Sequence, residues 1–164
     1  MKEDLKKNYK KILITLSCCL LLLMILNHIR INLTPSSPLG FYYIYKSKKF
    51  KKGDYIVYEM PNEYKRYTFN EMRDILTVKK IAAIQGDKIS VRNKKIYINN
   101  VYMGKMLDGI PTTLPEELVL NDKEVLTLSD RDDSLDGRYY GTIKIKDIKS
   151  NAILLKTINL AKIK

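Results

Sequence analysis

An uncharged apolar run near the start of the chain restricts its fold more than any other feature. Residues 12–26, with the sequence ILITLSCCLLLLMIL, carry no charge. At about 1.5 Å per residue, a helix of this run is roughly 22 Å long, which is short for a hydrocarbon core of about 30 Å. Tyr9 and the stems of Lys10 and Lys11 extend it by snorkelling, and residues 27–33 offer a continuation of the helix. We therefore expect one transmembrane helix.

This run divides the 164-residue chain into three parts. We expect a basic tail over residues 1–11, a transmembrane anchor over residues 12–31 and one folded domain over residues 32–164. A cleavable signal-peptide core is the alternative interpretation of the run. It is disfavoured because no small-x-small cleavage motif follows.

The charges on either side of the run predict its orientation. The first eleven residues are rich in lysine, opposed only by Glu3 and Asp4, whereas the far side begins with His28 and Arg30. A lysine excess holds a flanking segment in the cytoplasm. We expect the tail to be cytoplasmic, the anchor to cross the cytoplasmic membrane once, and the domain to lie in the periplasm or outside the cell.

Short strand-like runs separated by turns predict a mainly β domain. Asn93-Lys94 separates two such runs as the turn of a hairpin, and Asn99-Asn100 is a second turn. The strand candidates are residues 41–45, 55–58, 75–84, 88–92, 95–98, 101–103, 124–128, 142–148 and 153–155, the last two of which we expect to close the sheet. Residues 61–74 are interpreted as a short helix or loop and residues 104–120 as an irregular excursion.

Composition argues against several other classes of protein. The net charge of +12 comes mainly from scattered lysines without the interleaved aromatic side chains of a single-strand binder, so no nucleic-acid partner is expected. Cys18 and Cys19 are adjacent inside the apolar run and cannot staple the domain. No spacing of His, Cys and carboxylate residues resembles a metal site, so neither a metal nor a cofactor is expected.

Four motifs occur in one order along the chain. The first is NLTPSSPLGFY at residues 32–42, and the second is KGDYIVY at residues 52–58. The third is TVKKIAAIQGD at residues 77–87, and the fourth is LSDRDDSLDGR at residues 128–138. Together they resemble the TraF-type conjugative-transfer signal peptidases, within the wider type I signal peptidase family.

The resemblance implies a membrane-anchored hydrolase with a serine nucleophile and a lysine base. Its motifs put Ser36 in the nucleophile position and Lys79 in the base position. Lysine acts as a base only when neutral, and burial without a carboxylate partner lowers its pKa from about 10.4. Alternation along a strand turns Lys79 and Lys80 to opposite faces, so one of them can be buried. A Ser-His-Asp triad would have to use His28, the only histidine, at the membrane edge.

The resemblance also assigns supporting roles. Thr34, with the backbone N–H of Ser36, corresponds to the oxyanion hole, and Ser134 corresponds to the serine that orients the lysine amine. Asp136 and Arg138 are expected to pair and brace the site. Gly137 stands where the family often has serine, which leaves a hydroxyl function there in doubt.

Two further residues are expected to shape the nucleophile loop. Pro38, like Pro35, fixes φ and stiffens the loop. Gly40 is expected to allow a backbone conformation, or a close approach, that a Cβ would block.

The expected function is therefore cleavage of exported precursor proteins or their signal peptides at the outer surface of the membrane. A pilin or another conjugation-system precursor is the expected substrate, and the lipid bilayer is the second partner. General signal-peptide removal is the alternative within the same chemistry. A non-catalytic, membrane-tethered binding module of the same fold is the alternative outside it.

Overall fold

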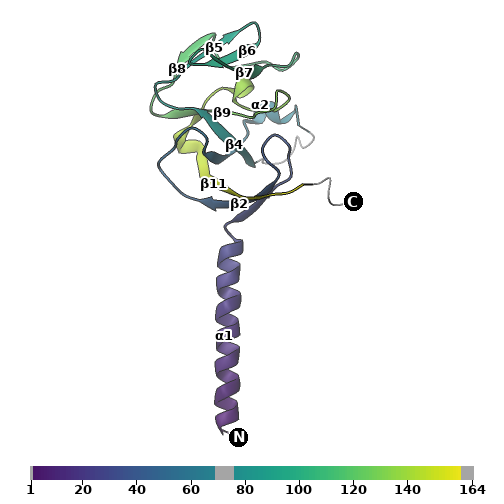
Figure 1. Ribbon diagram of the computed structural model, residues 1–164, viewed down its shortest axis with the longest axis vertical. Helices are drawn as coiled ribbons and strands as arrows, with labels where there is room; N and C mark the ends of the chain where they lie inside the picture. The colour runs from purple at the N-terminus through teal and green to yellow at the C-terminus, as the bar shows by residue number, and fades with distance from the viewer. Residues whose placement is uncertain (1, 69–75, 160–164) are drawn as a thin grey trace.

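The computed structural model describes residues 2–68 and 76–159, and it has a long helix joined to a β domain (Figure 1). Helix α1 (Lys2–Leu26) runs through the basic tail and the apolar run. Within it, residues Asn8–Leu26 are long and apolar enough to cross a membrane. The side chains of this stretch are exposed all around the helix. A helix that packs on a protein core would instead bury one apolar face.

The described part of the domain has two antiparallel sheets. The larger has the strand order β1-β2-β11-β3-β4-β9-β10. Its strands are β1 (Ile29–Asn32), β2 (Gly40–Tyr45), β3 (Tyr55–Glu59), β4 (Leu76–Ala83), β9 (Glu124–Leu128), β10 (Ile143–Lys144) and β11 (Ile148–Thr157). The mainly β domain with one N-terminal apolar helix is thus confirmed.

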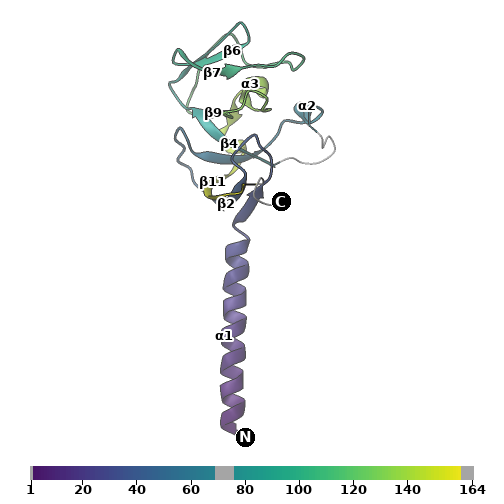
Figure 2. The same ribbon diagram turned by 45° about the vertical axis from the view of Figure 1, so that its right-hand side comes forward.

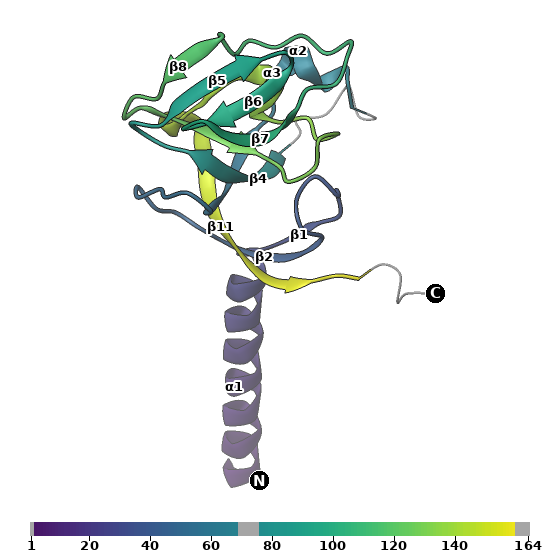
Figure 3. The ribbon, with the colours of Figure 1, turned by 45° about the horizontal axis from the view of Figure 1, so that its top comes forward.

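The smaller sheet lies at the end of the domain farthest from α1 (Figures 2 and 3). It has the order β7-β6-β5-β8, formed by β5 (Lys88–Arg92), β6 (Lys95–Ile98), β7 (Val101–Lys105) and β8 (Glu117–Val119). Positive φ angles at Asn93 and Lys94, and again at Asn99 and Asn100, make the two predicted tight turns. The remaining short elements are α2 (Asn62–Lys65), α3 (Gly137–Tyr140) and a 3₁₀ turn (Ile145–Asp147).

The principal core lies between the two sheets. Ile89 and Ile96 of the small sheet join Leu126 of β9 and Tyr139 of α3, and all four are fully buried. Because this core contains Ile56 and Ile81 from β3 and β4, burial of apolar area fixes the strand that carries Lys79.

Several boundaries differ from the predictions. Helix α1 ends at Leu26 and β1 begins at Ile29, so the predicted continuation of the helix through residues 27–33 is wrong. The ladder to β2 explains the change, because Ile29 pairs with Tyr43 and gains strand hydrogen bonds.

The C-terminal part also differs. β11 lies between β2 and β3 inside the large sheet, so it does not close the sheet as predicted. Residues 104–120 are not wholly irregular, since they include β8. Residues 61–74, predicted to form a short helix or loop, include α2, and residues 69–74 lie outside the described residues.

Candidate active site

Lys79 is buried in the centre of β4. Buried and partly exposed side chains alternate along this strand, so Lys79 faces inward with 1% of its surface exposed. Its neighbour Lys80 points the other way and pairs with Asp130, at 2.7 Å. The predicted separation of the two lysines onto opposite faces is therefore confirmed.

The amine of Lys79 has a neutral partner. Its Nζ donates to Ser134 Oγ at 2.8 Å, and Ser134 is itself buried. Desolvation lowers the pKa of Lys79 to about 8. Two nearby charges act in opposite directions on this pKa: Asp136 raises it and Arg138 lowers it. An amine with this pKa is substantially neutral near pH 8, which free lysine is not.

A buried ion pair supports the segment that carries Ser134. Asp136 caps α3: its Oδ1 accepts from Arg138 Nε at 2.9 Å and from the backbone N–H of Arg138 at 3.1 Å. Its Oδ2 accepts from the backbone N–H of Ser129 at 2.8 Å. Both side chains are fully buried. The expected pairing of Asp136 with Arg138 is thus present.

The guanidinium of Arg138 donates to three backbone carbonyls, which lie in two segments of the chain. Its NH1 donates to the carbonyl of Lys105 at 3.0 Å and to that of Asp132 at 3.2 Å, and its NH2 donates to the carbonyl of Ser129 at 2.9 Å. Gly137 between the two charged residues has a packing reason, because a Cβ there would lie 2.6 Å from the carbonyl oxygen of Thr127.

The loop that carries Ser36 is organised by Asn32, the last residue of β1. The Nδ2 of Asn32 donates to the carbonyls of Thr34, Ser37 and Pro38 at 3.0 to 3.2 Å. Its Oδ1 accepts from the hydroxyl of Thr34 at 2.7 Å and from the backbone N–H of Thr34 at 3.3 Å. The two ends of one buried side-chain amide, Nδ2 and Oδ1, thus hold the backbone of this loop in place.

Ser36 and Ser37 differ in what they contact. Ser37 is buried, and its hydroxyl donates to the carbonyl of Val78 on β4 at 2.6 Å. Ser36 is half-buried, and within the described residues its hydroxyl makes no hydrogen bond. The loop is therefore bound to the strand one residue before Lys79, while the Ser36 hydroxyl stays available.

The other predicted loop residues have specific neighbours. The carbonyl of Pro38 accepts from the hydroxyl of buried Tyr42 at 2.8 Å. Gly40 lies against β11, where a Cβ would stand 2.1 Å from the carbonyl oxygen of Lys156. The expected close approach at Gly40 is confirmed. The Thr34 hydroxyl, which donates to Asn32, must turn away from Asn32 before it can donate elsewhere.

Sequence reasoning missed Asn32, Ser37 and Tyr42 as loop-forming residues. Asn32 and Tyr42 are the first and last residues of the first motif. The sequence therefore marked their positions but did not indicate that they hold the loop together. An asparagine just before a Thr-Pro turn is a known source of side-chain-to-backbone bonds, and this was the usable signal.

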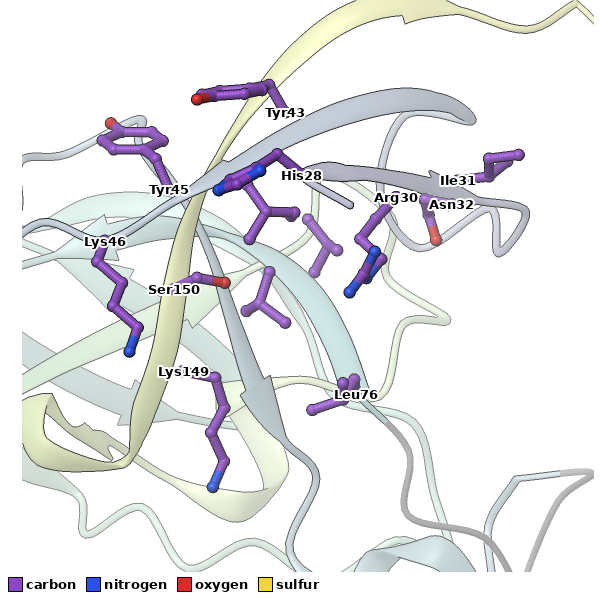
Figure 4. Close-up of a pocket in the computed structure, with 13 residues that line it drawn as sticks. His28, Arg30, Ile31, Asn32, Tyr43, Tyr45, Lys46, Leu76, Lys149 and Ser150 are labelled. Carbon is purple, nitrogen blue, oxygen red and sulfur yellow. The ribbon is translucent and has the colours of Figure 1, made fainter. Parts of the chain in front are cut away.

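A groove lies beside the nucleophile loop, between β1 and β4. Its volume is about 660 Å³, and it is lined by Asn32 and by the apolar side chains of Ile44, Val57 and Val78, among others. Figure 4 shows the labelled residues around it, among them Arg30, Lys46 and Lys149. Among the residues searched, all within the described part of the chain, no group of His, Cys, Asp and Glu could hold a metal ion.

These features define a β domain with a buried lysine–serine contact, joined to a helix of membrane-spanning length. The model of the family described as signal peptidase, peptidase S26, matches residues 6–155. The chain therefore belongs to the peptidase S26 family of signal peptidases.

Among the solved structures that match this chain is a signal peptidase I from Enterococcus faecalis, with 18% sequence identity and a TM-score of 0.41. The match covers 66% of this chain and 97% of that one. A search of curated proteins found no match.

Proposed function

We propose that this signal-peptidase-family chain is a membrane-anchored serine endopeptidase in which Ser36 is the nucleophile and Lys79 the general base. The single observation that carries the proposal is the burial of Lys79 against Ser134, with its pKa lowered to about 8. A buried lysine without a carboxylate partner destabilises the fold. Such a perturbed pKa is typical of a lysine that acts in its neutral form as a catalytic base.

The chemistry follows from the neutral amine. Lys79 takes the proton of the Ser36 hydroxyl as Oγ attacks the scissile carbonyl, which gives a tetrahedral intermediate. The protonated lysine then gives that proton to the leaving amine, and Ser36 becomes an acyl ester. Water, deprotonated by Lys79, attacks the ester and restores both residues. Ser134 orients the amine through its 2.8 Å hydrogen bond.

The oxyanion is stabilised by the backbone N–H of Ser36 and the hydroxyl of Thr34. Within the described residues that N–H makes no hydrogen bond, so it is open to a ligand. The Thr34 hydroxyl rotates from Asn32 to the oxyanion as negative charge develops there. A donor lost from such a hole costs roughly 2.7–4 kcal/mol.

The groove beside the loop receives the precursor. β1 is an edge strand of the large sheet, so one side of its backbone lacks a strand partner in the described part of the chain. An extended peptide adds to such an edge through main-chain hydrogen bonds, with its side chains in the groove. Because β1 leads from α1 to the Ser36 loop, the peptide runs from the membrane toward the nucleophile.

The domain rests on the bilayer surface. Only two residues separate α1 from β1, and β2 and β11 lie at the end of the domain next to α1 in Figures 1 and 2. The outward side chains of these strands are apolar and exposed, from 37% to 57% of their surface; they are Ile31, Phe41, Tyr43, Ile153 and Leu155. Aromatic and aliphatic groups of this kind belong at a membrane interface.

The lysine-rich N-terminus stays in the cytoplasm, and the domain faces the periplasm or cell exterior. The substrate is an exported precursor, and by resemblance of the first motif a pilin or another conjugation-system protein. General signal-peptide removal is the second candidate, supported by the family match itself.

The test is precursor processing by the full chain in detergent against a panel of exported precursors. Ser36→Ala and Lys79→Ala are expected to abolish processing, with losses that do not add because neither residue works alone. Lys80→Ala is the matched control and should process normally, since that amine pairs with Asp130 on the other face. Ser37→Ala removes the bond to Val78 and should retain most activity. A dead Ser37→Ala variant beside an active Ser36→Ala variant would refute the assignment of the nucleophile.

Topology is tested separately by protease accessibility in cells with the outer membrane face exposed. Added protease should cut the domain and leave a tag placed before Met1 intact. Cleavage of the tag with protection of the domain would reverse the orientation.

A further inference from the structure

Basic side chains surround the groove without any acid to balance them. Its walls include Arg30 from β1, Lys46 just after β2 and Lys149 from β11, with His28 beside them. Among the described residues that line the groove there is no Asp or Glu. Figure 4 shows these three long side chains on the same side of the strand that carries Tyr43, around one hollow.

The three long cations are not neutralised elsewhere in the described structure. The side-chain amines of Lys46 and Lys149 make no hydrogen bond or ion pair there. Arg30 NH1 donates only to backbone carbonyls, those of Asn27 at 3.1 Å and Ile29 at 3.0 Å. Other surface lysines do have carboxylate partners, as Lys52 with Asp87 and Lys88 with Glu117 show. Unpaired cations gathered around one groove produce a positive potential at the place where a ligand enters.

Part of the lining of the same groove is apolar. Ile44, Val57 and Val78 contribute to it, and Val57 and Val78 come from strands next to one another in the sheet. The groove therefore suits a segment that has small apolar side chains on one face and negative charge on the other. A free anion or a bare lipid headgroup would use only the cations and leave the apolar part of the lining uncovered.

We propose that this groove selects precursors with acidic side chains in the segment between their apolar core and the scissile bond. The proposal rests on the proposed function, because it requires the precursor to run along β1 toward Ser36. The basic residues lie at the membrane end of that path and the Ser36 loop at the other. A carboxylate on the precursor would therefore meet Arg30, Lys46 and Lys149 before the scissile bond reaches the nucleophile.

The experiment uses the full chain in micelles of a zwitterionic detergent with synthetic model precursors. Each precursor has an apolar helix, a short extended segment and an Ala-x-Ala cleavage site. An aspartate is moved one position at a time through the extended segment, with asparagine and lysine versions as matched controls. Solvent-exposed ion pairs each change an affinity by a few-fold, so the best aspartate precursor should be cleaved with a kcat/KM about three- to tenfold above its asparagine control. The lysine version should fall below both.

Charge reversal in the protein provides the second arm. The double variant Lys46→Glu/Lys149→Glu should invert the order, so that the lysine precursor becomes the best substrate. Lys95→Glu is the control, because Lys95 lies on β6 in the distal sheet and does not line the groove. The preference should also shrink as salt is raised, since screening weakens exposed charge pairs.

Binding to the Ser36→Ala variant, measured by fluorescence anisotropy of labelled precursors, gives a readout that needs no catalysis. Equal binding and cleavage of the aspartate, asparagine and lysine precursors would overturn the proposed selectivity for acidic precursors. It would leave the proposed peptidase activity unaffected. Preferential aspartate binding without cleavage by the Ser36-containing protein would support the groove and refute the peptidase. An aspartate preference that is unchanged in the Lys46→Glu/Lys149→Glu variant would also overturn the assignment.

Discussion

Replacing Lys79 with methionine should stabilise the fold at neutral pH while removing the base. The pKa of Lys79 is about 8 in the folded protein, against 10.5 for the unperturbed group. At about 1.36 kcal/mol per pKa unit, this difference opposes folding by about 3 kcal/mol when the solution pH is below both values. Methionine has a similar length and no charge. It leaves Ser134 without its partner, which costs about 1 kcal/mol, so the net gain should be about 2 kcal/mol.

The sign of the pH dependence follows from proton binding. Between pH 8 and 10.5 the unfolded chain holds the Lys79 proton more tightly than the folded chain, so wild-type stability rises with pH across this window. The advantage of Lys79→Met therefore shrinks by about 2 kcal/mol between neutral pH and about pH 9.5.

The assay is urea denaturation of the full chain in micelles, followed by far-ultraviolet circular dichroism at both pH values. Near neutral pH the variant should also melt about 5–10 °C above the wild type. Lys80→Met is the control, because Lys80 is partly exposed and paired with Asp130 and should show no such gain. A Lys79→Met variant that is less stable than the wild type at neutral pH, or whose advantage is the same at both pH values, would refute the desolvation argument.

Three further predictions follow from the same contacts. Processing activity should rise about tenfold per pH unit up to about pH 8 and then level off, because Lys79 loses its proton over this range. The rate of cleavage of a model precursor, measured against pH, checks this, and a flat profile would contradict it. Asn32→Ala should lower kcat about tenfold or more with little change in the melting temperature, because it frees the Ser36 loop; a loss confined to KM would count against this role. Gly40→Ala should destabilise the domain by about 2 kcal/mol or more in denaturant titration, since its Cβ would overlap the carbonyl of Lys156, and unchanged stability would show that β11 yields there.

Local patterns sufficed for much of the fold, and non-local pairing explains the errors. The hairpin at Asn93-Lys94 and the opposite facing of Lys79 and Lys80 were predictable because turn chemistry and strand alternation act over a few residues. β1 was missed because its stability comes from pairing with β2, a separate segment that begins at Gly40, and not from its own sequence. The central place of β11 depends likewise on ladders to β2 and β3, which the order of strands along the chain does not reveal.

The candidate site divides in a similar way. Lys79 and Ser134 were named from their motifs, and their 2.8 Å contact agrees with the expected orienting role. The bonds of Asn32 could not be predicted in the same way, because one amide reaches three carbonyls only after the loop has closed on itself. Hydrogen bonds from a side chain to backbone carbonyls do not impose a regular spacing of residue types, so no sequence pattern indicates such a network.

The Asp136–Arg138 pair explains why Lys79 keeps a low pKa beside a buried carboxylate. Asp136 alone would stabilise the ammonium form and hold Lys79 protonated, as a carboxylate near a buried lysine does. Arg138 lies against that carboxylate at 2.9 Å, and its own charge acts on Lys79 in the opposite direction. With the two charges opposing each other, desolvation remains as the dominant influence and the amine tends to neutrality. The ion pair therefore braces the Ser134 segment through its hydrogen bonds without supplying a counter-ion to Lys79. A lysine base requires this absence of a counter-ion, because a counter-ion would keep the amine protonated.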